Sequence, residues 1–166
     1  MSKLIRHFLP GQSCFITSVT ANREPLLVQH ARLLARAVRR AGNKDDFKVV
    51  AWVVLPDHFH LILNAPNGDT SRIMQRMKLS FSGQYKSRTR IAGSVWQPQY
   101  WDHIIRSQED MNRHIDYIHY NPVKHGLADS PKEYRLSSFK KYCREGKCDL
   151  NWREIGDSFG NHEYGK

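Results

Sequence analysis

The sequence lacks any long apolar run. Its longest, from Val49 to Leu55, is far shorter than the roughly 20 residues that a membrane-spanning helix needs. The N-terminal stretch MSKLIRHFLPGQS is too short in its apolar part and too interrupted for a secretory signal. We therefore expect a soluble protein of the cytoplasm with no membrane partner.

Cysteine is also scarce. The three cysteines, Cys14, Cys143 and Cys148, form an odd and sparse set, which fits reduced thiols in a reducing compartment. Cys143 and Cys148 could begin a structural zinc site, but there is no second ligand pair at zinc spacing to complete it. With 166 residues the chain can bury a core without disulfides or metal ions.

Acidic residues are too few to balance the basic ones. Lys and Arg number 26 against 16 Asp and Glu, which gives a formal charge of +10 and a sequence pI near 9.7. This balance fits a polyanionic partner: nucleic acid first, an anionic membrane surface second. A basic surface that serves only solubility remains an alternative, and charge alone does not choose among the three.

The periodicity of apolar residues predicts alternating strands and helices, with no internal repeat. The expected elements are a strand over 13–21, a helix over 25–41, strands over 47–55 and 58–65, a helix over 70–87, a strand over 100–105 and a helix over 108–120. This order is the split βαβ arrangement of a ferredoxin-like (RRM-like) α+β fold, an antiparallel sheet with helices packed on it. We expect the helices on one face and the other face open for a ligand.

The last expected helix has marked ends. Ser107 and Asp110 resemble a capping pair at its start, and Asn121-Pro122 is expected to interrupt it. The segment from about Lys140 looks loosely organised. This tail could hang free, but we predict that it packs near the functional site.

Two histidines stand in an otherwise apolar strand, in the stretch VVLPDHFHLIL. Because side chains alternate along a strand, His58 and His60 face one side while Phe59 faces the other. Two neighbouring imidazoles can hold one divalent metal ion if oxygen donors join them. The alternative is a pair of histidines at the surface or core edge with satisfied hydrogen bonds.

Tyr117 and Asn121 lie four residues apart, so they share one face of the last helix. If this face looks toward the histidine pair, the Asn121 oxygen can complete a metal site and Tyr117 stands beside it. A metal ion polarises a phosphate and a tyrosine oxygen can attack it, so the set suits phosphoryl transfer.

The motifs LPDHFH, WQPQYWDHIIRS and DYIHYNPVKHG, in this order and spacing, resemble those of the REP-associated tyrosine transposases of bacteria, a branch of the single-tyrosine HUH transposase and nuclease superfamily (IS200-like transposases). The resemblance covers roughly residues 8–140. It implies an enzyme that cuts and rejoins single-stranded DNA at palindromic REP hairpins, as a monomer or homodimer and in association with the nucleoid. It also implies a catalytic domain over 1–140 with an extension over 141–166.

The resemblance assigns roles to the candidate residues. It implies that His58 and His60 bind Mg²⁺ or Mn²⁺ and that Tyr117 forms a covalent 5′-phosphotyrosine bond. Mobile single-tyrosine transposases usually carry Gln four residues after the tyrosine, whereas this chain has Asn121, as the REP-associated branch does. Tyr120 is the competing nucleophile, but only Tyr117 is followed by Asn at the fourth position.

Other residues near these motifs receive plainer expectations. Asp57 is expected to be a turn residue, and Asn121 alternatively a cap for the turn that follows it. His114 is expected to be a solvated helix histidine, with support of a metal ligand or of Tyr117 as the alternative. Trp96, Tyr100 and Trp101 could stack on unpaired bases, although aromatic residues more often pack in the core. The basic residues expected to contact DNA phosphates are Arg72, Arg76, Lys78, Lys86, Arg88, Arg90, Arg106 and Lys124.

A second class of function remains open from the sequence. A ferredoxin-like sheet with stacking aromatics could bind single-stranded nucleic acid without any chemistry. The two classes differ in their need for a divalent metal ion and for Tyr117.

Overall fold

The computed structural model describes residues 10–152. Its elements are β1 (Ser13–Val19), η1 (Ala21–Arg23), α1 (Ala31–Gly42), β2 (Lys48–Val54), β3 (His58–Asn64), α2 (Thr70–Thr89), β4 (Trp101–Ile104), α3 (Gln108–Lys124), η2 (Pro131–Glu133) and α4 (Phe139–Arg144). The strands pair antiparallel in the order β2-β3-β1-β4. The α+β, ferredoxin-like prediction is confirmed. None of the described helices is long and apolar enough to cross a membrane.

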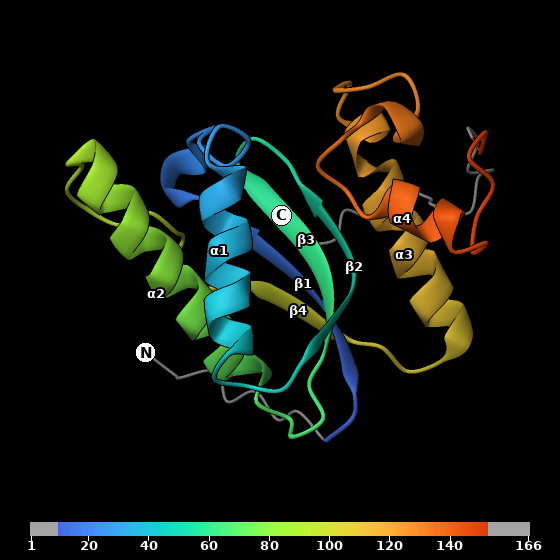
Figure 1. Cartoon of the computed structure of the whole chain (residues 1–166), viewed down its shortest axis with the longest axis horizontal. Coiled ribbons are helices and arrows are strands. Elements are labelled where there is room, and N and C mark those ends of the chain that lie inside the picture. The colour runs from blue at the N-terminus through green and yellow to red at the C-terminus, as the bar shows by residue number, and fades with distance from the viewer. Residues whose placement is uncertain (1–9, 153–166) are drawn as a thin grey trace.

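Helices cover both faces of the sheet, with α1 and α2 on one side and α3 and α4 on the other (Figure 1). The expectation of an open second face is therefore wrong over β2 and β3. The reason lies in the face that carries Phe15, Val53 and Ile62, which are fully buried. These apolar side chains need a cover, and Ile118 of α3 and Tyr142 of α4 provide it.

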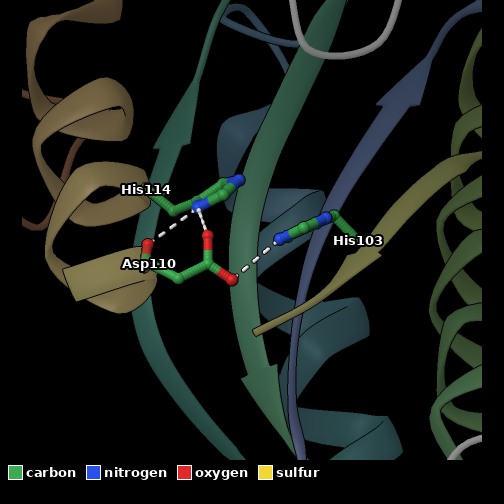
Figure 2. A group of neighbouring side chains, drawn as sticks. All are labelled: His103, Asp110 and His114. Atoms are coloured by element: carbon green, nitrogen blue, oxygen red, sulfur yellow. Dashed lines mark hydrogen bonds and ion pairs between the residues drawn. The ribbon is translucent and has the colours of Figure 1, made fainter. Parts of the chain in front are cut away.

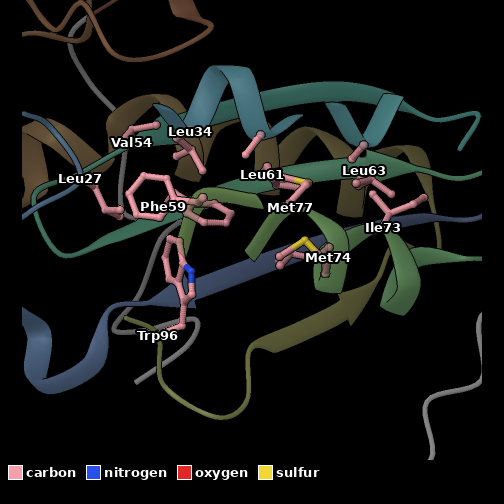
Figure 3. Packing of buried hydrophobic residues seen from close by; sticks show 14 of the residues in the cluster. Leu27, Leu34, Val54, Phe59, Leu61, Leu63, Ile73, Met74, Met77 and Trp96 are labelled. Atoms are coloured by element: carbon pink, nitrogen blue, oxygen red, sulfur yellow. The ribbon is translucent and has the colours of Figure 1, made fainter. Parts of the chain in front are cut away.

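The larger core lies between the sheet and the α1/α2 pair (Figure 3). Phe59, Leu61 and Leu63 alternate from β3 into this core, while Met74 and Met77 approach from α2. This is the alternation that the sequence predicts, and it sends His60 to the opposite face.

Helix α3 begins as predicted but ends later. The Ser107 side chain accepts a hydrogen bond from the Asp110 N–H at 3.0 Å, which confirms the capping pair. The predicted interruption at Asn121-Pro122 is wrong, because α3 continues to Lys124 with Pro122 inside it. A proline in a helix removes one backbone hydrogen-bond donor. Burial of the last turn against the sheet compensates for that loss, and Asn121 in this turn is fully buried.

The segment after α3 protects the edge of the sheet. Ser138 N donates to the Trp52 carbonyl oxygen at 2.9 Å, and Val54 N donates to the Leu136 carbonyl oxygen at 2.8 Å. Backbone groups of the edge strand β2 are thus paired rather than left open to another chain.

The chain from Lys140 onward is better organised than the sequence suggests. Cys143 and Cys148 form a disulfide, with their Cα atoms 4.6 Å apart. The expectation of reduced thiols is wrong for this pair, because the turn after α4 brings the two cysteines within bonding range, and a disulfide leaves no thiolate to bind zinc. Trp152 packs against Phe139 and Tyr120. The remainder of the predicted tail, with Tyr164, lies outside the described residues.

Candidate active site

The histidine pair lies on β3, on the face turned toward α3. The ring centroids of His58 and His60 are 4.9 Å apart, and the two residues are 7% and 1% exposed. Phe15 of β1 stacks against the His60 ring at 5.4 Å. Both imidazoles are therefore held side by side in a largely dry environment.

Each imidazole is fixed through its Nδ1 atom. The Nδ1–H of His58 donates to Asp57 Oδ1 at 2.6 Å, and the Thr17 hydroxyl is hydrogen-bonded to His60 Nδ1 at 2.7 Å. Asp57 is thus more than a turn residue, and Arg23 in turn pairs with it at 3.0 Å. Because the Nδ1 atoms are engaged, the Nε2 atoms are the nitrogens available to a metal ion.

Electrostatics keep these imidazoles neutral. Burial lowers the pKa of His60 well below its usual value, and repulsion from His58 or His125, when either is protonated, and from Lys124 lowers it further. Burial also lowers the pKa of His58, although the hydrogen bond and charge of Asp57 act in the opposite direction. A neutral imidazole has the lone pair that a metal ion requires.

One face of α3 looks directly at the histidine pair. Tyr117 contacts the His60 ring at 5.3 Å between centroids, and His125, just after the helix, contacts the His58 ring at 5.3 Å. Asn121 lies midway between them at the same four-residue spacing, so it faces the gap between these two contacts. The sequence reasoning missed His125, although its position four residues after Asn121 continues the same stripe.

The Asn121 side chain is buried and has unpaired polar atoms, as expected for a metal ligand. It is fully buried, and within residues 10–152 neither Oδ1 nor Nδ2 has a hydrogen-bond partner. The Nε2 atom of His60 is likewise buried without a partner in this part of the chain. Buried polar atoms rarely stay unpaired, so these atoms point to something that binds them. Two imidazole nitrogens and an amide oxygen fit a divalent metal ion.

A lysine brings positive charge to the tyrosine. Lys124 Nζ lies 5.4 Å from the centroid of the Tyr117 ring. The lysine is exposed on the last turn of α3. A cation here stabilises negative charge on a tyrosine oxygen or on a phosphate that approaches it.

A second polar cluster, of His103, Asp110 and His114, joins β4 to the start of α3 (Figure 2). The Asp110 carboxylate accepts from His103 Nε2 at 2.9 Å and from the Arg106 backbone N–H at 2.9 Å. His114 Nδ1 lies 3.1 Å from Asp110 Oδ1 and donates to the Asp110 carbonyl oxygen at 2.8 Å. His114 is only 1% exposed, so the expectation of a solvated histidine is wrong.

We interpret this cluster as a hydrogen-bonded clamp, although its ligand atoms lie within 4.8 Å of one another, as in a metal site. The nitrogen of His114 that faces Asp110 carries a proton for the backbone carbonyl, and a protonated nitrogen has no lone pair for a metal ion. Burial would raise the pKa of Asp110, but the Arg106 N–H and His103 outweigh it and lower that pKa. The clamp therefore keeps its carboxylate ionised and fixes α3 against β4.

The basic residues predicted to contact DNA fall into two groups. Arg106 precedes the N-cap of α3 and Lys124 lies in its last turn, and α3 packs on the sheet face that carries the histidine pair. The others lie on α2 or at its C-terminal end, across the sheet from that pair (Figure 1). They are Arg72, Arg76, Lys78, Lys86, Arg88 and Arg90.

Three of the α2 residues already have partners within the protein. Arg72 and Arg76 pair with the buried Asp45 at 3.0 and 2.7 Å. Lys78 donates to the Gln97 carbonyl oxygen at 3.0 Å and lies over the Trp96 ring. Structural pairing gives these residues a role apart from DNA, and DNA contact by α2 stays a prediction.

An antiparallel ferredoxin-like sheet with a histidine pair facing a helix tyrosine defines a class, the IS200-like transposases. The chain belongs to this family, whose model, described as "Transposase IS200 like", matches residues 13–121. Such transposases are enzymes that act on DNA, and the family generally depends on divalent metal ions.

Two relatives make the family more specific. The REP-associated tyrosine transposase of Escherichia coli K12 is 32% identical over 155 residues, covering 92% of this chain and 91% of the relative. A putative REP-associated tyrosine transposase of Haemophilus influenzae is 33% identical over 153 residues, covering 85% of this chain and 87% of the relative. The chain is thus a member of the REP-associated tyrosine transposase branch.

Solved structures agree with this assignment. A REP-associated tyrosine transposase bound to a REP hairpin superimposes with a TM-score of 0.89 at 29% identity, covering 100% of this chain and 98% of the other. A putative transposase from Deinococcus radiodurans R1 has a TM-score of 0.50 at 22% identity over 70% of this chain and 95% of its own, which supports the fold alone.

Proposed function

We propose that this protein is a metal-dependent single-stranded DNA endonuclease and strand transferase that acts at REP-type palindromic hairpins. The observation that carries the proposal is the placement of Tyr117 against His60, with the unpaired Asn121 one turn further along α3. A nucleophile, two neutral imidazoles and an amide oxygen meet on one face of the sheet.

The metal ligands in this proposal are His58 and His60 through Nε2 and Asn121 through Oδ1. Mg²⁺ and Mn²⁺ are the ions that the family resemblance suggests, and the mixed nitrogen and oxygen donor set accommodates either. When bound, such an ion polarises the phosphate and offsets the charge that develops during attack. Asp57 and Thr17 keep the two imidazoles in the correct tautomer and orientation.

Tyr117 acts as the nucleophile. Its hydroxyl oxygen forms a bond to phosphorus while the bond from phosphorus to the 3′ oxygen breaks. The phenolic proton is transferred through solvent to the leaving 3′ oxygen, which becomes a hydroxyl. The 5′ phosphate stays on Tyr117, and a 3′ hydroxyl that attacks this phosphotyrosine restores a DNA strand without any outside energy source.

Three considerations support the DNA partner. The structural relative with a TM-score of 0.89 was solved with a REP hairpin, which supports a hairpin substrate for this chain. Lys124 lies beside Tyr117 and Arg106 begins the clamp that anchors α3, so we assign both to phosphates near the cut. The formal charge of +10 favours such a partner.

The test is a covalent adduct. Wild-type protein is incubated with a labelled hairpin oligonucleotide from its host's repeats, with Mg²⁺, with Mn²⁺ or with EDTA, and run on a denaturing gel. We expect a shifted band of protein linked to DNA in the presence of either metal ion and none in EDTA. His58→Ala and His60→Ala should lose this band.

Matched tyrosine variants identify the nucleophile. Tyr117→Phe should abolish the adduct, whereas Tyr120→Phe, one turn of the same helix away, should retain it. Tight hairpin binding by wild type with no adduct under any metal condition would instead indicate a binding module without catalysis.

A further inference from the structure

Among the aromatic residues around the candidate site, Trp101 differs in its exposure. Trp96 is 5% exposed in the α1/α2 core, and its indole N–H donates to the Lys78 carbonyl oxygen at 3.2 Å. Tyr100 packs against the same core. Trp101, on the edge strand β4, is 37% exposed and lies on the opposite face of the sheet, with the histidine pair. A large aromatic surface at this position requires an explanation.

The sheet register places Trp101 in line with the metal-binding histidine. Thr17 of β1 pairs with His60 of β3 on one side and with Trp101 of β4 on the other. Residues paired across an antiparallel sheet point to the same face, so these three side chains form one row. Two strand spacings separate the backbones of His60 and Trp101 by roughly 10 Å, so a neighbouring nucleotide can span the gap between them.

The plane of the Trp101 ring is set by its neighbours. It is parallel to the His103 ring within 7°, with centroids 6.2 Å apart, and His103 is parallel to the His114 ring within 14° at 4.7 Å. His103 is held by Asp110 (Figure 2). Phe15 also meets Trp101 edge-on at 5.7 Å. Trp101 is therefore the most exposed ring of an ordered row.

We propose that Trp101 is a stacking platform for an unpaired base next to the phosphate that Tyr117 attacks. The inference rests on the proposed function and deepens it, because it names a positioning residue for the DNA strand. Stacking tolerates any base, since every base has a flat π-face. Trp101 thus holds the strand in place while other contacts read its sequence.

Binding of oligonucleotides that contain an abasic site tests this assignment. All proteins carry Tyr117→Phe so that no cleavage occurs, and EDTA is present so that metal binding does not contribute. A labelled hairpin with single-stranded flanks is made in versions that each lack one base in a flank. We expect the loss of one particular base to weaken binding about tenfold to hundredfold, as base stacking on an aromatic residue predicts.

Trp101→Ala gives the decisive comparison. It should weaken binding of intact DNA by a similar factor and should lose no further affinity when that base is missing, because the two changes remove the same contact. Trp101→Tyr should restore most of the affinity. Leu79→Ala is the control, because Leu79 is a large apolar residue, 64% exposed, on α2 across the sheet.

Two outcomes would contradict the proposal. If Trp101→Ala binds intact DNA normally, or if it stays equally sensitive to every missing base, the platform is wrong. A 2-aminopurine base at the sensitive position should also lose fluorescence on binding when Trp101 is present, which covers the case in which Trp101→Ala folds poorly. The adduct assay is independent of these binding measurements. A negative result for stacking on Trp101 therefore does not contradict the tyrosine mechanism, and absence of the adduct does not contradict stacking.

Discussion

Thr17 and Asp57 each hold the Nδ1 atom of one histidine, and that contact determines which nitrogen remains for a ligand. His60 depends on the Thr17 hydroxyl at 2.7 Å, because its ring is buried and has no other hydrogen-bond partner in the described chain. A buried ring without this contact could turn or change tautomer. The contact from Thr17 therefore belongs to the proposed metal site, although Thr17 is not itself a proposed ligand.

At the residue scale we predict that Thr17→Val weakens the site. Valine keeps the β-branched shape that suits a strand but removes the hydroxyl, so His60 loses its orienting partner. We expect metal affinity, measured by the Mn²⁺ concentration that gives half-maximal adduct, to fall about tenfold to hundredfold, as for other partners of metal ligands.

The control for Thr17 is its neighbour on β1. Ser18 is fully buried on the other face, and its hydroxyl has no hydrogen-bond partner within residues 10–152. Ser18→Ala should leave the Mn²⁺ dependence unchanged. An equal loss in both variants would mean that Thr17 acts through strand stability and not through His60.

Helix α3 carries Tyr117 and Asn121, so the site depends on how firmly this element is fixed. Its N-terminal end is held by the Asp110 clamp, which reaches His103 on β4 and the Arg106 backbone. Tyr117 lies about two turns along the helix, close enough for a tilt at the first turn to move its hydroxyl. The clamp thus positions Tyr117, the proposed nucleophile.

At the element scale we predict that Asp110→Ala destabilises the protein and slows adduct formation. The carboxylate is nearly buried and accepts several hydrogen bonds, and unpaired buried donors cost about 1 to 3 kcal/mol of unfolding free energy. Urea denaturation measures this loss. Without urea, where the variant remains folded, the rate of adduct formation should also fall, because α3 is held less firmly.

Glu109→Ala is the matched comparison for the clamp. Glu109 lies in the same first turn of α3 with the same charge, but its side chain is exposed. Losing its favourable interaction with the helix dipole should cost less than about 1 kcal/mol. Equal destabilisation of both variants would assign the effect to charge at the helix start and would contradict the clamp.

At the scale of the whole molecule, local patterns in the sequence predict most of the fold. The two-residue alternation around Phe59 predicts which face receives His60, and the four-residue spacing relates Tyr117 to Asn121. The bounds of the strands differ by no more than two residues from those expected. These features depend on neighbours in the sequence, where periodicity carries the information.

Long-range contacts could not be predicted in this way. The link between His103 and His114 runs through Asp110 and requires β4 to lie beside α3. The late end of α3 depends on burial of its last turn, which no local rule reports. The disulfide between Cys143 and Cys148 depends on the turn after α4. The position of α2 across the sheet from the site likewise appears only in three dimensions.

The last prediction follows from the position of α2 and α3 on opposite faces of the sheet. A short single strand that occupies the α3 side can reach Lys124 but not the far side of the sheet, where Lys86 and Arg88 lie. In a Tyr117→Phe background, Lys124→Gln should weaken binding of such an oligonucleotide and reduce the slope of log affinity against log salt by about 0.7, the value for one phosphate contact to a single strand. Lys44→Gln, an exposed lysine in the turn after α1, is the control.

The same measurement decides how α2 takes part. Lys86→Gln and Arg88→Gln should leave the short single strand unaffected, because α2 packs on the opposite face from Tyr117. If they weaken only DNA that includes the complete hairpin, the duplex wraps around the protein to reach α2 and the predicted contacts there are correct. If they weaken the short strand as much as Lys124→Gln does, the DNA path assigned to the α3 side is wrong, since one short strand cannot touch both faces of the sheet.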